Sequence, residues 1–386
     1  MKSQKKVCIA GPSKRFTSGI SYYTIKLASA MSDSYQVSVV CFRQLLPTFL
    51  FPGKDHVGKN ISTLNFNSRV NVFDGMDYNN PFTWLRAYRF LRYQKPDIVI
   101  LQWWTSSVAH MHILLKLFAG LTCRPKVIIE FHEVVDPFED SILPIRAYSR
   151  FMGKLLRKDL SAYITHSESD KKLIAQRYNI DPGNIYVIPH GLYDQYGTPF
   201  DSNTAKEQLS IKEEFVVLSF GLIRKYKGIP DLIKAFEQLP GEIVHNSRLL
   251  IVGEIWDDRK DIMDQIAASP CKDKITLIDE YIPDDRVSLY FSAADVVVLP
   301  YLRASQSGIA HIAMVFGKPV VVSHVGGLQE SMADYRGTFF VEPGNTREIA
   351  AAIAGRFGSD EKYEPPQRTW DATLNYYSEV MTKLFD

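Results

Sequence analysis

Cationic side chains follow one apolar run in the second half of this 386-residue sequence and precede a predicted helix. The run ends in SFGLIRKYKGIPDLIKAF, where Arg224 and Lys227 stand just before a helix expected over residues 228–238. Cations beside a helix N-terminus are suited to bind a diphosphate, because free backbone N–H groups and fixed positive charges both attract phosphate oxygens. A solvated cationic turn is an equally simple interpretation of the same residues.

Small hydroxyl and amide residues form a second candidate anion site in PYLRASQSGIAHIAMVFGKPVVVS. Between a predicted strand and a predicted apolar helix from Ile309 stand four such residues: Ser305, Gln306, Ser307 and Gly308. The backbone N–H groups of Ser307 and Gly308 can face an anion at such a helix start. In the first half, the loop GPSKRFTSGISYYT places Gly19 at the start of a helix expected over residues 20–31. It lacks the GxGxxG and Walker patterns, so NAD and ATP binding are unsupported.

A histidine and a glutamate, His132 and Glu133, end the apolar run KVIIEFHEV. Ligands of open α/β sheets bind outside the carboxyl ends of the strands, so His132 is placed to hydrogen-bond a sugar hydroxyl or a reacting group. A structural histidine with satisfied hydrogen bonds is an equally simple interpretation. His166 and His190 stand at corresponding positions and have weaker cases.

Short β-branched runs alternate with amphipathic segments along nearly the whole chain, which predicts an α/β fold. The strand-like runs are apolar at both alternating sets of positions, as in parallel sheets covered on both faces. They include DIVILQW, DVVVLPY and, over residues 61–66, ISTLNF. The polar stretch over 191–211 marks a seam. We therefore expect two Rossmann-like, doubly wound domains over residues 1–191 and 192–365, facing a central cleft, and a C-terminal helix over 366–386 that crosses back to the first domain.

Composition excludes several classes of protein. The formal net charge of +2 argues against a nucleic-acid binder. No apolar run is long enough to span a bilayer, and the N-terminal apolar stretch VCIA is too short for a signal peptide. The four cysteines have no metal-ligand or disulfide spacing, which favours free thiols in a reducing cytoplasm.

Taken in order, these segments resemble the family 4 glycosyltransferases, which have the GT-B fold. FHE is similar to the family's His-Asp strand end, with Glu133 in place of Asp, and VIPHG is similar to its VIPNG. FGLIRKYKG resembles the family's FVGR…KG segment, in which Lys227 matches the diphosphate-binding lysine and Arg224 substitutes for the arginine. DEYIPDDRVSLYFSAADVVVLPY and AMVFGKPVVVSHVGGLQE resemble two further segments of the family.

The resemblance implies a set of donor-binding residues, which includes Glu133 and, at the start of the helix after the SQSG loop, Ser307, Gly308 and Ile309. The Gly19 loop looks like the family's phosphate loop, and Tyr281 and Ile282 match the loop whose backbone contacts the nucleobase. The family's two glutamates, with seven residues between them, correspond to Ala304 and Ile312 here. The chain thus resembles an SQSG-loop variant, in which Gln306 or Ser305 takes over the sugar contact.

The activity that the resemblance implies is transfer of a sugar from a nucleoside diphosphate to an acceptor hydroxyl. Retention of configuration, no metal ion and no cofactor are implied, with His132 orienting the sugar. Arg224, Lys227 and the N–H groups near Gly19, Ser307 and Gly308 would stabilise the departing diphosphate.

Basic residues at four-residue spacing suggest what lies near the acceptor. Arg146, Arg150, Lys154 and Lys158 share a predicted helix with apolar residues, and FRQLLPTFLFPGK is a second apolar stretch with cations. Together they predict contact with an anionic membrane and a glycan or lipid-linked acceptor, at the inner face of the membrane. The alternative is an ordinary amphipathic helix with a solvated basic face.

Three other functions fit parts of the sequence. A sugar-nucleotide epimerase shares the GT-B architecture, but it would need an acidic cluster in the cleft, and the sequence shows no convincing set. A catalytically silent sugar-nucleotide or glycan-binding protein is suggested by the missing glutamates. An NAD-dependent oxidoreductase is the third alternative, and absence of nicotinamide binding would exclude it.

Overall fold

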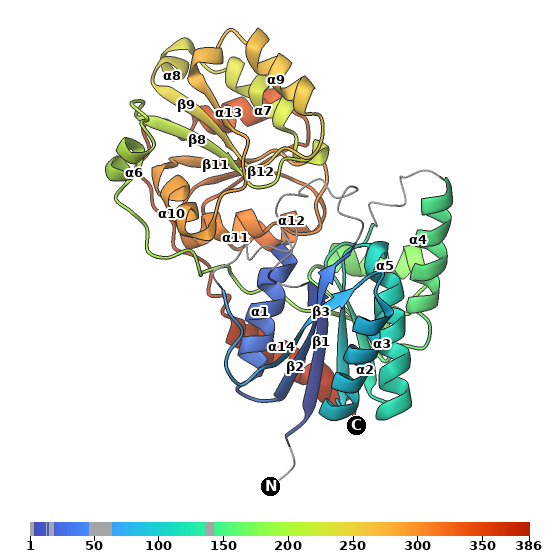
Figure 1. Cartoon of the computed structure of the whole chain (residues 1–386). Coiled ribbons are helices and arrows are strands. Elements are labelled where there is room, and N and C mark those ends of the chain that lie inside the picture. The colour runs from blue at the N-terminus through green and yellow to red at the C-terminus, as the bar shows by residue number, and fades with distance from the viewer. Residues whose placement is uncertain (1–3, 13, 15–18, 46–63, 136–142) are drawn as a thin grey trace. The chain divides into compact units, whose positions relative to one another are not determined.

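The computed structural model describes residues 4–12, 14, 19–45, 64–135 and 143–386. The chain divides into two compact units. The first unit contains residues up to Gly191 together with Arg368–Asp386, and the second unit is Leu192–Gln367. Each unit is built around its own parallel sheet (Figure 1).

The first unit has a seven-stranded sheet with the order β3-β2-β1-β4-β5-β6-β7. Its strands are β1 (Lys6–Pro12), β2 (Gln36–Gln44), β3 (Asn71–Asp77), β4 (Ile98–Trp103), β5 (Lys126–Phe131), β6 (Ala162–Thr165) and β7 (Ile185–Val187). Every neighbouring pair of strands is parallel. Its main helices are α1 (Gly19–Met31), α2 (Pro81–Gln94), α3 (Ala109–Thr122), α4 (Leu143–Leu156), α5 (Glu168–Tyr178) and α14 (Trp370–Lys383).

Both faces of this sheet are buried, as the apolar runs predict. In β1, Val7 and Ile9 pack into one core, and Cys8 and Ala10 pack into the other. Successive strand residues point to opposite faces, so a strand covered on both sides must be apolar at every position. Helices α1 and α14 cover one face, whereas α2, α3 and α5 contribute to the other.

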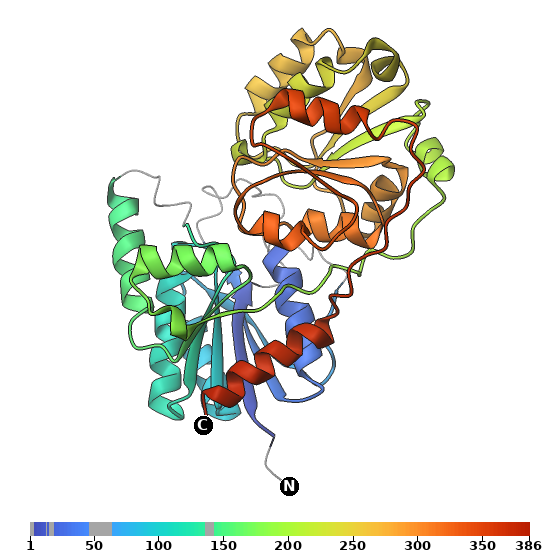
Figure 2. The same ribbon diagram turned by 180° about the vertical axis from the view of Figure 1, so that it is seen from behind.

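The C-terminal helix α14 completes the first unit. It lies beside α1 on the sheet (Figure 2), and Leu374, Tyr377 and Val380 are buried in the same core as β1. The side chain of Trp370 lies against Gly191, where a Cβ atom would come within 2.7 Å of the indole. The last residues of the chain therefore belong to the hydrophobic core of the unit that begins it.

The second unit has a six-stranded sheet with the order β10-β9-β8-β11-β12-β13. Its strands are β8 (Phe215–Phe220), β9 (Ser247–Val252), β10 (Ile275–Ile278), β11 (Val296–Leu299), β12 (Val320–Ser323) and β13 (Thr338–Val341). Its helices are α6 (Ser202–Gln208), α7 (Ile229–Glu237), α8 (Gly241–His245), α9 (Arg259–Ala268), α10 (Asp284–Ala293), α11 (Gly308–Val315), α12 (Gly326–Met332) and α13 (Thr346–Ala354).

Both strand orders reverse direction at one point, between β1 and β4 and between β8 and β11. This is the doubly wound Rossmann arrangement, in which ligands bind beyond the carboxyl ends of the strands at the switch point. The segments after β8 and β11 carry Lys227 and Ser307. The fold thus brings two of the predicted anion-binding segments to one edge of one sheet.

One predicted strand is wrong. Residues 61–63 lie outside the described part of the chain, and Leu64–Phe66 form no strand. The sheet instead uses β3, whose sequence NVFDGMD is exposed or half-buried over its first four residues. As an edge strand it pairs on one side only, and two register shifts interrupt that pairing, so its sequence lacks the apolar signature of the inner strands.

A substitution in α14 tests whether this helix is integral to the first unit. Leu374→Ala should lower the free energy of unfolding by about 2–5 kcal/mol, because it leaves a cavity in a packed core. Urea unfolding followed by tryptophan fluorescence measures this, since Trp84, Trp103, Trp104 and Trp370 all lie in the first unit. The control is Tyr376→Ala, at a side chain that is 45% exposed. Equal effects of the two substitutions would contradict a core role for α14.

Candidate functional site

Lys227 lies at the switch point of the second sheet, beside the helix that follows β11. A Cβ atom at Gly221 would lie 3.0 Å from Cδ1 of Ile309 and 3.5 Å from Nζ of Lys227. The ammonium also lies 5.1 Å from the ring centroid of Tyr301. Burial lowers the pKa of Lys227 below its ordinary value. The half-buried side chain therefore carries a partly desolvated cation, which an anionic ligand would stabilise.

Close backbone contacts hold the Lys227 loop in place. Gly228 has a φ of 66°, and a Cβ atom there would lie 2.0 Å from the carbonyl oxygen of Pro300. The amide of Leu302 donates to the carbonyl of Tyr226 at 2.7 Å. The loops after β8 and β11 are thus joined through their backbones, and only glycine fits at position 228.

The N-terminus of α11 adds backbone donors at the same place. Ser307 is the N-cap, and its hydroxyl accepts from the amide of Ala310 while its carbonyl accepts from the amide of His311. The amides of Gly308 and Ile309 are the orphan donors of the first turn. Tyr301 lies 3.4 Å from the Ser307 hydroxyl, which connects this cap to the Lys227 pocket. The predicted Lys227, Ser307, Gly308 and Ile309 are therefore neighbours.

Gln306 precedes this cap with both polar atoms of its side chain buried. Neither Oε1 nor Nε2 of Gln306 has a hydrogen-bond partner among the described residues. A buried amide without a partner is costly, and a ligand with hydroxyl groups would satisfy it. Ser305 is half-buried beside it.

Arg224 differs from the expectation for a diphosphate-binding cation. Its Nε donates to Asp257 at 2.6 Å, and its guanidinium lies over the ring of Trp256. Its charge is balanced within the protein, so the structure leaves Lys227 as the stronger candidate of the two.

The predicted nucleobase loop follows β10. Ile282 is buried and Tyr281 is half-buried in the connection to α10. Two strands, β9 and β8, separate β10 from β11 in the sheet order.

In the first unit, the glycine loop after β1 is partly outside the described residues, which include Gly11 and Gly19. Gly11 faces the protein interior, because a Cβ atom there would lie 2.1 Å from Oε1 of Gln102. Gly19 is the first residue of α1, and a Cβ atom there would meet no described residue within 4 Å. Gly19 therefore has more room around it than Gly11, which is compatible with the predicted phosphate loop.

His132 lies directly after β5, and its imidazole is buried in a cluster that the sequence did not predict. Nε2 of His132 lies 3.9 Å from Oε2 of Glu130, and Nε2 of His166 lies 3.8 Å from Oε1. Tyr23 packs its ring edge-on at 4.6 Å from His132. The pKa of His132 is lowered well below its ordinary value, mainly by burial and to a smaller extent by the nearby His166. The imidazole is therefore neutral at pH 7.

Glu130 is the functional candidate that the sequence analysis missed. It sits inside β5 with no exposed surface, and Tyr23 donates to its Oε1 at 2.7 Å. Tyr377 of α14 donates to the same oxygen. The sequence did contain a signal for it: Glu130 is a charged residue inside KVIIEFHEV, an apolar run of the kind that is buried on both faces of a sheet. Glu133, which the family resemblance indicates as a donor-binding residue, is half-buried just beyond His132.

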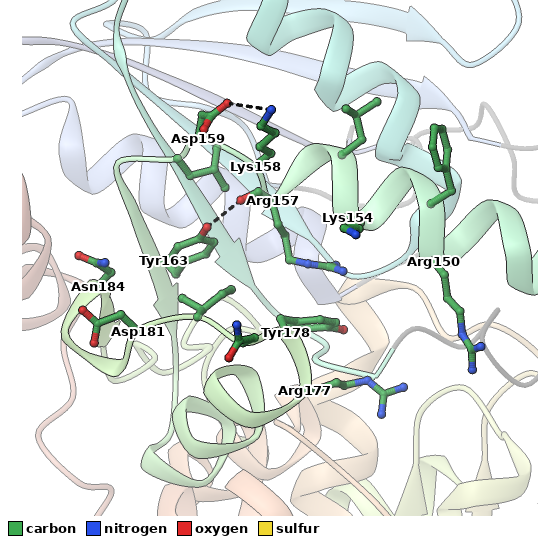
Figure 3. Close-up of a pocket in the computed structure, with 15 residues that line it drawn as sticks. Arg150, Lys154, Arg157, Lys158, Asp159, Tyr163, Arg177, Tyr178, Asp181 and Asn184 are labelled. Carbon is green, nitrogen blue, oxygen red and sulfur yellow. Dashed lines mark hydrogen bonds and ion pairs between the residues drawn. The ribbon is translucent and has the colours of Figure 1, made fainter.

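A basic cavity of about 1060 Å³ lies between α4 and α5 in the first unit (Figure 3). Its cationic lining residues are Arg150, Lys154, Arg157, Lys158 and Arg177. Helix α4 presents small residues inward, Ser149 and Gly153, and leaves Phe151 66% exposed. Lys158 follows the end of the helix, and FRQLLPTFLFPGK lies mostly outside the described residues.

Two family profiles match consecutive parts of the chain. The family described as Glycosyltransferase Family 4 matches residues 17–195, and the one described as Glycosyl transferases group 1 matches residues 201–365. The chain belongs to the family 4 glycosyltransferases. The resemblance read from the sequence segments is confirmed.

Curated relatives of this family 4 member match it over parts of their length. The D-inositol 3-phosphate glycosyltransferase of Mycobacteroides abscessus is 28% identical over 195 residues, which are 49% of this chain and 43% of that protein. An uncharacterized glycosyltransferase of Methanocaldococcus jannaschii is 29% identical over 64% of this chain and 65% of its own length. The lipopolysaccharide 1,2-N-acetylglucosaminetransferase of Salmonella typhimurium is 23% identical over 72% of this chain and 74% of its own.

Solved structures show that the fold is GT-B. Sucrose-phosphate synthase from Thermosynechococcus elongatus has a TM-score of 0.74 at 17% identity and covers 99% of both chains. Anabaena HepE in complex with UDP and glucose has a TM-score of 0.67 at 18% identity, over 98% of this chain and 95% of that one.

Within the described residues of this family 4 member, no helix combines the length and the apolar character needed to cross a bilayer.

Replacing Lys227 with methionine tests the desolvation of its ammonium. Since the pKa of Lys227 is lowered on folding, the charged lysine disfavours the folded state below that pKa, and the cost disappears as the pH rises to the ordinary value of 10.5. Lys227→Met should therefore be at least as stable as the wild type at pH 7, and its advantage should shrink towards pH 10.5. Urea unfolding of both proteins at several pH values measures the difference. A difference that is constant with pH would contradict a desolvated ammonium.

Proposed function

We propose that this chain transfers a sugar from a nucleoside diphosphate sugar to an acceptor hydroxyl. The observation that carries the proposal is the meeting of the Lys227 ammonium, Gly221 and the N-terminus of α11 at the switch point of the second sheet. A cation and the amides of a helix start at such a position are suited to bind a phosphate group. Family membership supports the same class of reaction.

The chemical role of this site is to stabilise the leaving diphosphate. Negative charge develops on the diphosphate as the bond to the sugar breaks, and Lys227 with the amides of Gly308 and Ile309 would stabilise it. Because Lys227 is poorly solvated before the ligand binds, its charge interacts strongly with a phosphate oxygen. We propose that this fixed positive charge serves without a metal ion and without a cofactor.

Retention of the anomeric configuration is part of the proposal and rests on the family resemblance. In such a transfer the acceptor attacks from the side of the leaving group, and the phosphate oxygen helps to take its proton. His132 would contact the sugar as a neutral imidazole, since its burial disfavours the charged form. A strong protein base is then not required.

We propose UDP as the first nucleotide to test, because solved relatives of the same fold contain UDP or UDP-glucose. Tyr281 and Ile282 would contact the base, and Gly19 would contact the phosphates. Gln306 is proposed to bind sugar hydroxyls, since its buried amide has no partner within the described residues. A neutral amide would thus stand in for the carboxylate that the family's signature supplies.

Binding of UDP tests the diphosphate site directly. Lys227→Met should raise the Kd for UDP about 10- to 100-fold, the equivalent of losing a hydrogen bond to a charged group worth about 1.5–3 kcal/mol. The matched control is Lys225→Met, at the neighbouring cation whose side chain is 80% exposed and which should leave the Kd unchanged. Isothermal titration calorimetry measures both.

Turnover separates the transferase from its alternatives. The wild type should release sugar slowly from a labelled donor with retained configuration, and Gln306→Ala should slow this while leaving the Kd for UDP near that of the wild type. Tight donor binding without turnover would instead indicate a sugar-nucleotide-binding protein. Formation of an epimerised sugar would indicate an epimerase. Equal loss of UDP binding in both lysine variants would contradict the assigned site.

The acceptor is proposed to be a glycan or lipid-linked molecule at the inner face of a membrane. Relatives named as inositol phosphate and lipopolysaccharide glycosyltransferases support a phosphorylated or glycolipid acceptor. The structure adds that α4 exposes Phe151 and Leu155 beside Arg150 and Lys154. Exposed apolar side chains flanked by cations suit an anionic bilayer surface better than water.

Charge reversal on α4 tests this contact. Arg150→Glu combined with Lys154→Glu should weaken binding to phosphatidylglycerol vesicles by at least about 30-fold, since each basic residue near an anionic surface contributes about 1 kcal/mol. The control reverses the same number of exposed charges on α2, with Arg86→Glu and Arg89→Glu. Cosedimentation measures both, and wild-type binding should weaken with salt. Equal binding to phosphatidylcholine vesicles would contradict the proposal.

A further inference from the structure

Two tyrosines hold the carboxylate of Glu130 in the buried cluster of the first unit. Tyr23 from α1 donates to Oε1 at 2.7 Å, Tyr377 from α14 donates to the same oxygen, and their hydroxyl oxygens lie 2.8 Å apart. The pKa of both phenols is raised well above the ordinary value, mainly by burial and secondly by the negative charge of Glu130. Both tyrosines therefore stay protonated and act as donors.

The other carboxylate oxygen, Oε2, faces His132. Gln102 approaches Oε2 with its amide nitrogen at 3.4 Å, and Nε2 of His132 lies 3.9 Å away. Nε2 of His132 is buried and has no hydrogen-bond partner among the described residues. At 3.9 Å the carboxylate acts on the imidazole through its charge, which is weakly screened at a site without solvent.

This charge selects one of the two neutral forms of the imidazole. A carboxylate can only accept, so the tautomer with its proton on Nε2 is favoured and Nδ1 becomes an acceptor. His166 has a different arrangement, because its Nδ1 lies 2.9 Å from the carbonyl of Ile188 and must carry a proton there. The tautomer of His132 thus depends on Glu130, whereas the Nδ1 proton of His166 depends on the backbone.

We propose that Glu130 is a positioning residue that fixes His132 with its proton on Nε2, and that Tyr23 and Tyr377 hold Glu130 for this purpose. The inference rests on the proposed function for the role of His132 towards the sugar, which it would contact as an acceptor through Nδ1. It gives the C-terminal helix a specific part in the site, since Tyr377 reaches Glu130 from α14.

Glu130→Gln is the decisive substitution. The amide oxygen can still accept from both phenols, which places the NH₂ group where Oε2 was, facing Nε2 of His132. The long contact from the Gln102 amide nitrogen, at 3.4 Å, is lost in this variant. A donor at that position favours the other tautomer, with the proton on Nδ1. Long-range ¹H–¹⁵N spectra of the ¹⁵N-histidine-labelled full chain should show this exchange for His132, while His166 keeps its Nδ1 proton as an internal control.

Kinetics with a labelled nucleotide sugar provide the second measurement. In Glu130→Gln the kcat of donor hydrolysis should fall about 10- to 100-fold, as for other residues that orient a functional imidazole, with little change in KM. Tyr377→Phe should lower kcat by a smaller factor, because Tyr23 still holds the carboxylate. Its matched control is Tyr376→Phe, the exposed neighbour on α14, which should behave as the wild type.

Two results would overturn the proposal. The first is a His132 tautomer that is the same in the wild type and in folded Glu130→Gln; this is read in the free protein, so it stands whether or not the chain transfers sugar. The second is one equivalent of a transition metal in the purified protein that is lost in His166→Gln. The ligand atoms of Glu130, His132 and His166 lie within 4.8 Å of one another, and a bound metal would occupy both Nε2 atoms.

Discussion

Parallel sheets buried on both faces are the constraint that determines where polar groups can lie in each unit. Val7 and Ile9 face one core and Cys8 and Ala10 face the other, so the strand interior has no solvated side. Hydrogen-bonding side chains are then excluded from most strand positions by the cost of desolvation. They gather where strands end, and both sheets reverse their order at a point where two such ends are adjacent.

The two units treat buried charge differently. In the second unit, Lys227 is desolvated beside Gly221 and Ile309, and Ser307 and Gly308 supply a helix start nearby. In the described part of the chain Lys227 forms no ion pair with a carboxylate, and we propose that it meets the phosphates of the donor. In the first unit, Glu130 sits within the strand itself and is matched by two phenols and an amide. A carboxylate at such a depth is tolerated because these three donors compensate part of its lost hydration.

Most of the fold could be predicted because inner parallel strands have a strong sequence signal. Runs such as DIVILQW and DVVVLPY correspond to β4 and β11, and the helix expected over residues 20–31 corresponds to α1. The edge strand β3 was missed since half of its residues face solvent and need not be apolar. The apolar pattern of residues 61–66 predicted a strand there instead, but the described part of that segment pairs with no strand.

The candidate site could be predicted where local sequence motifs determine it. It could not be predicted where the side chains in contact come from distant parts of the sequence. Lys227 and Ser307 lie in the segments that follow β8 and β11, and the family resemblance singles out Lys227 among the cations there. The contact of Tyr377 with Glu130 joins residues 247 positions apart, and it exists only because α14 packs on the sheet that begins the chain. No local pattern marks such a pair. What the sequence does show is a glutamate in an apolar strand, and a charge in that position requires partners from elsewhere in the fold. A buried charge inside a predicted inner strand is therefore the feature from which to look for distant donors.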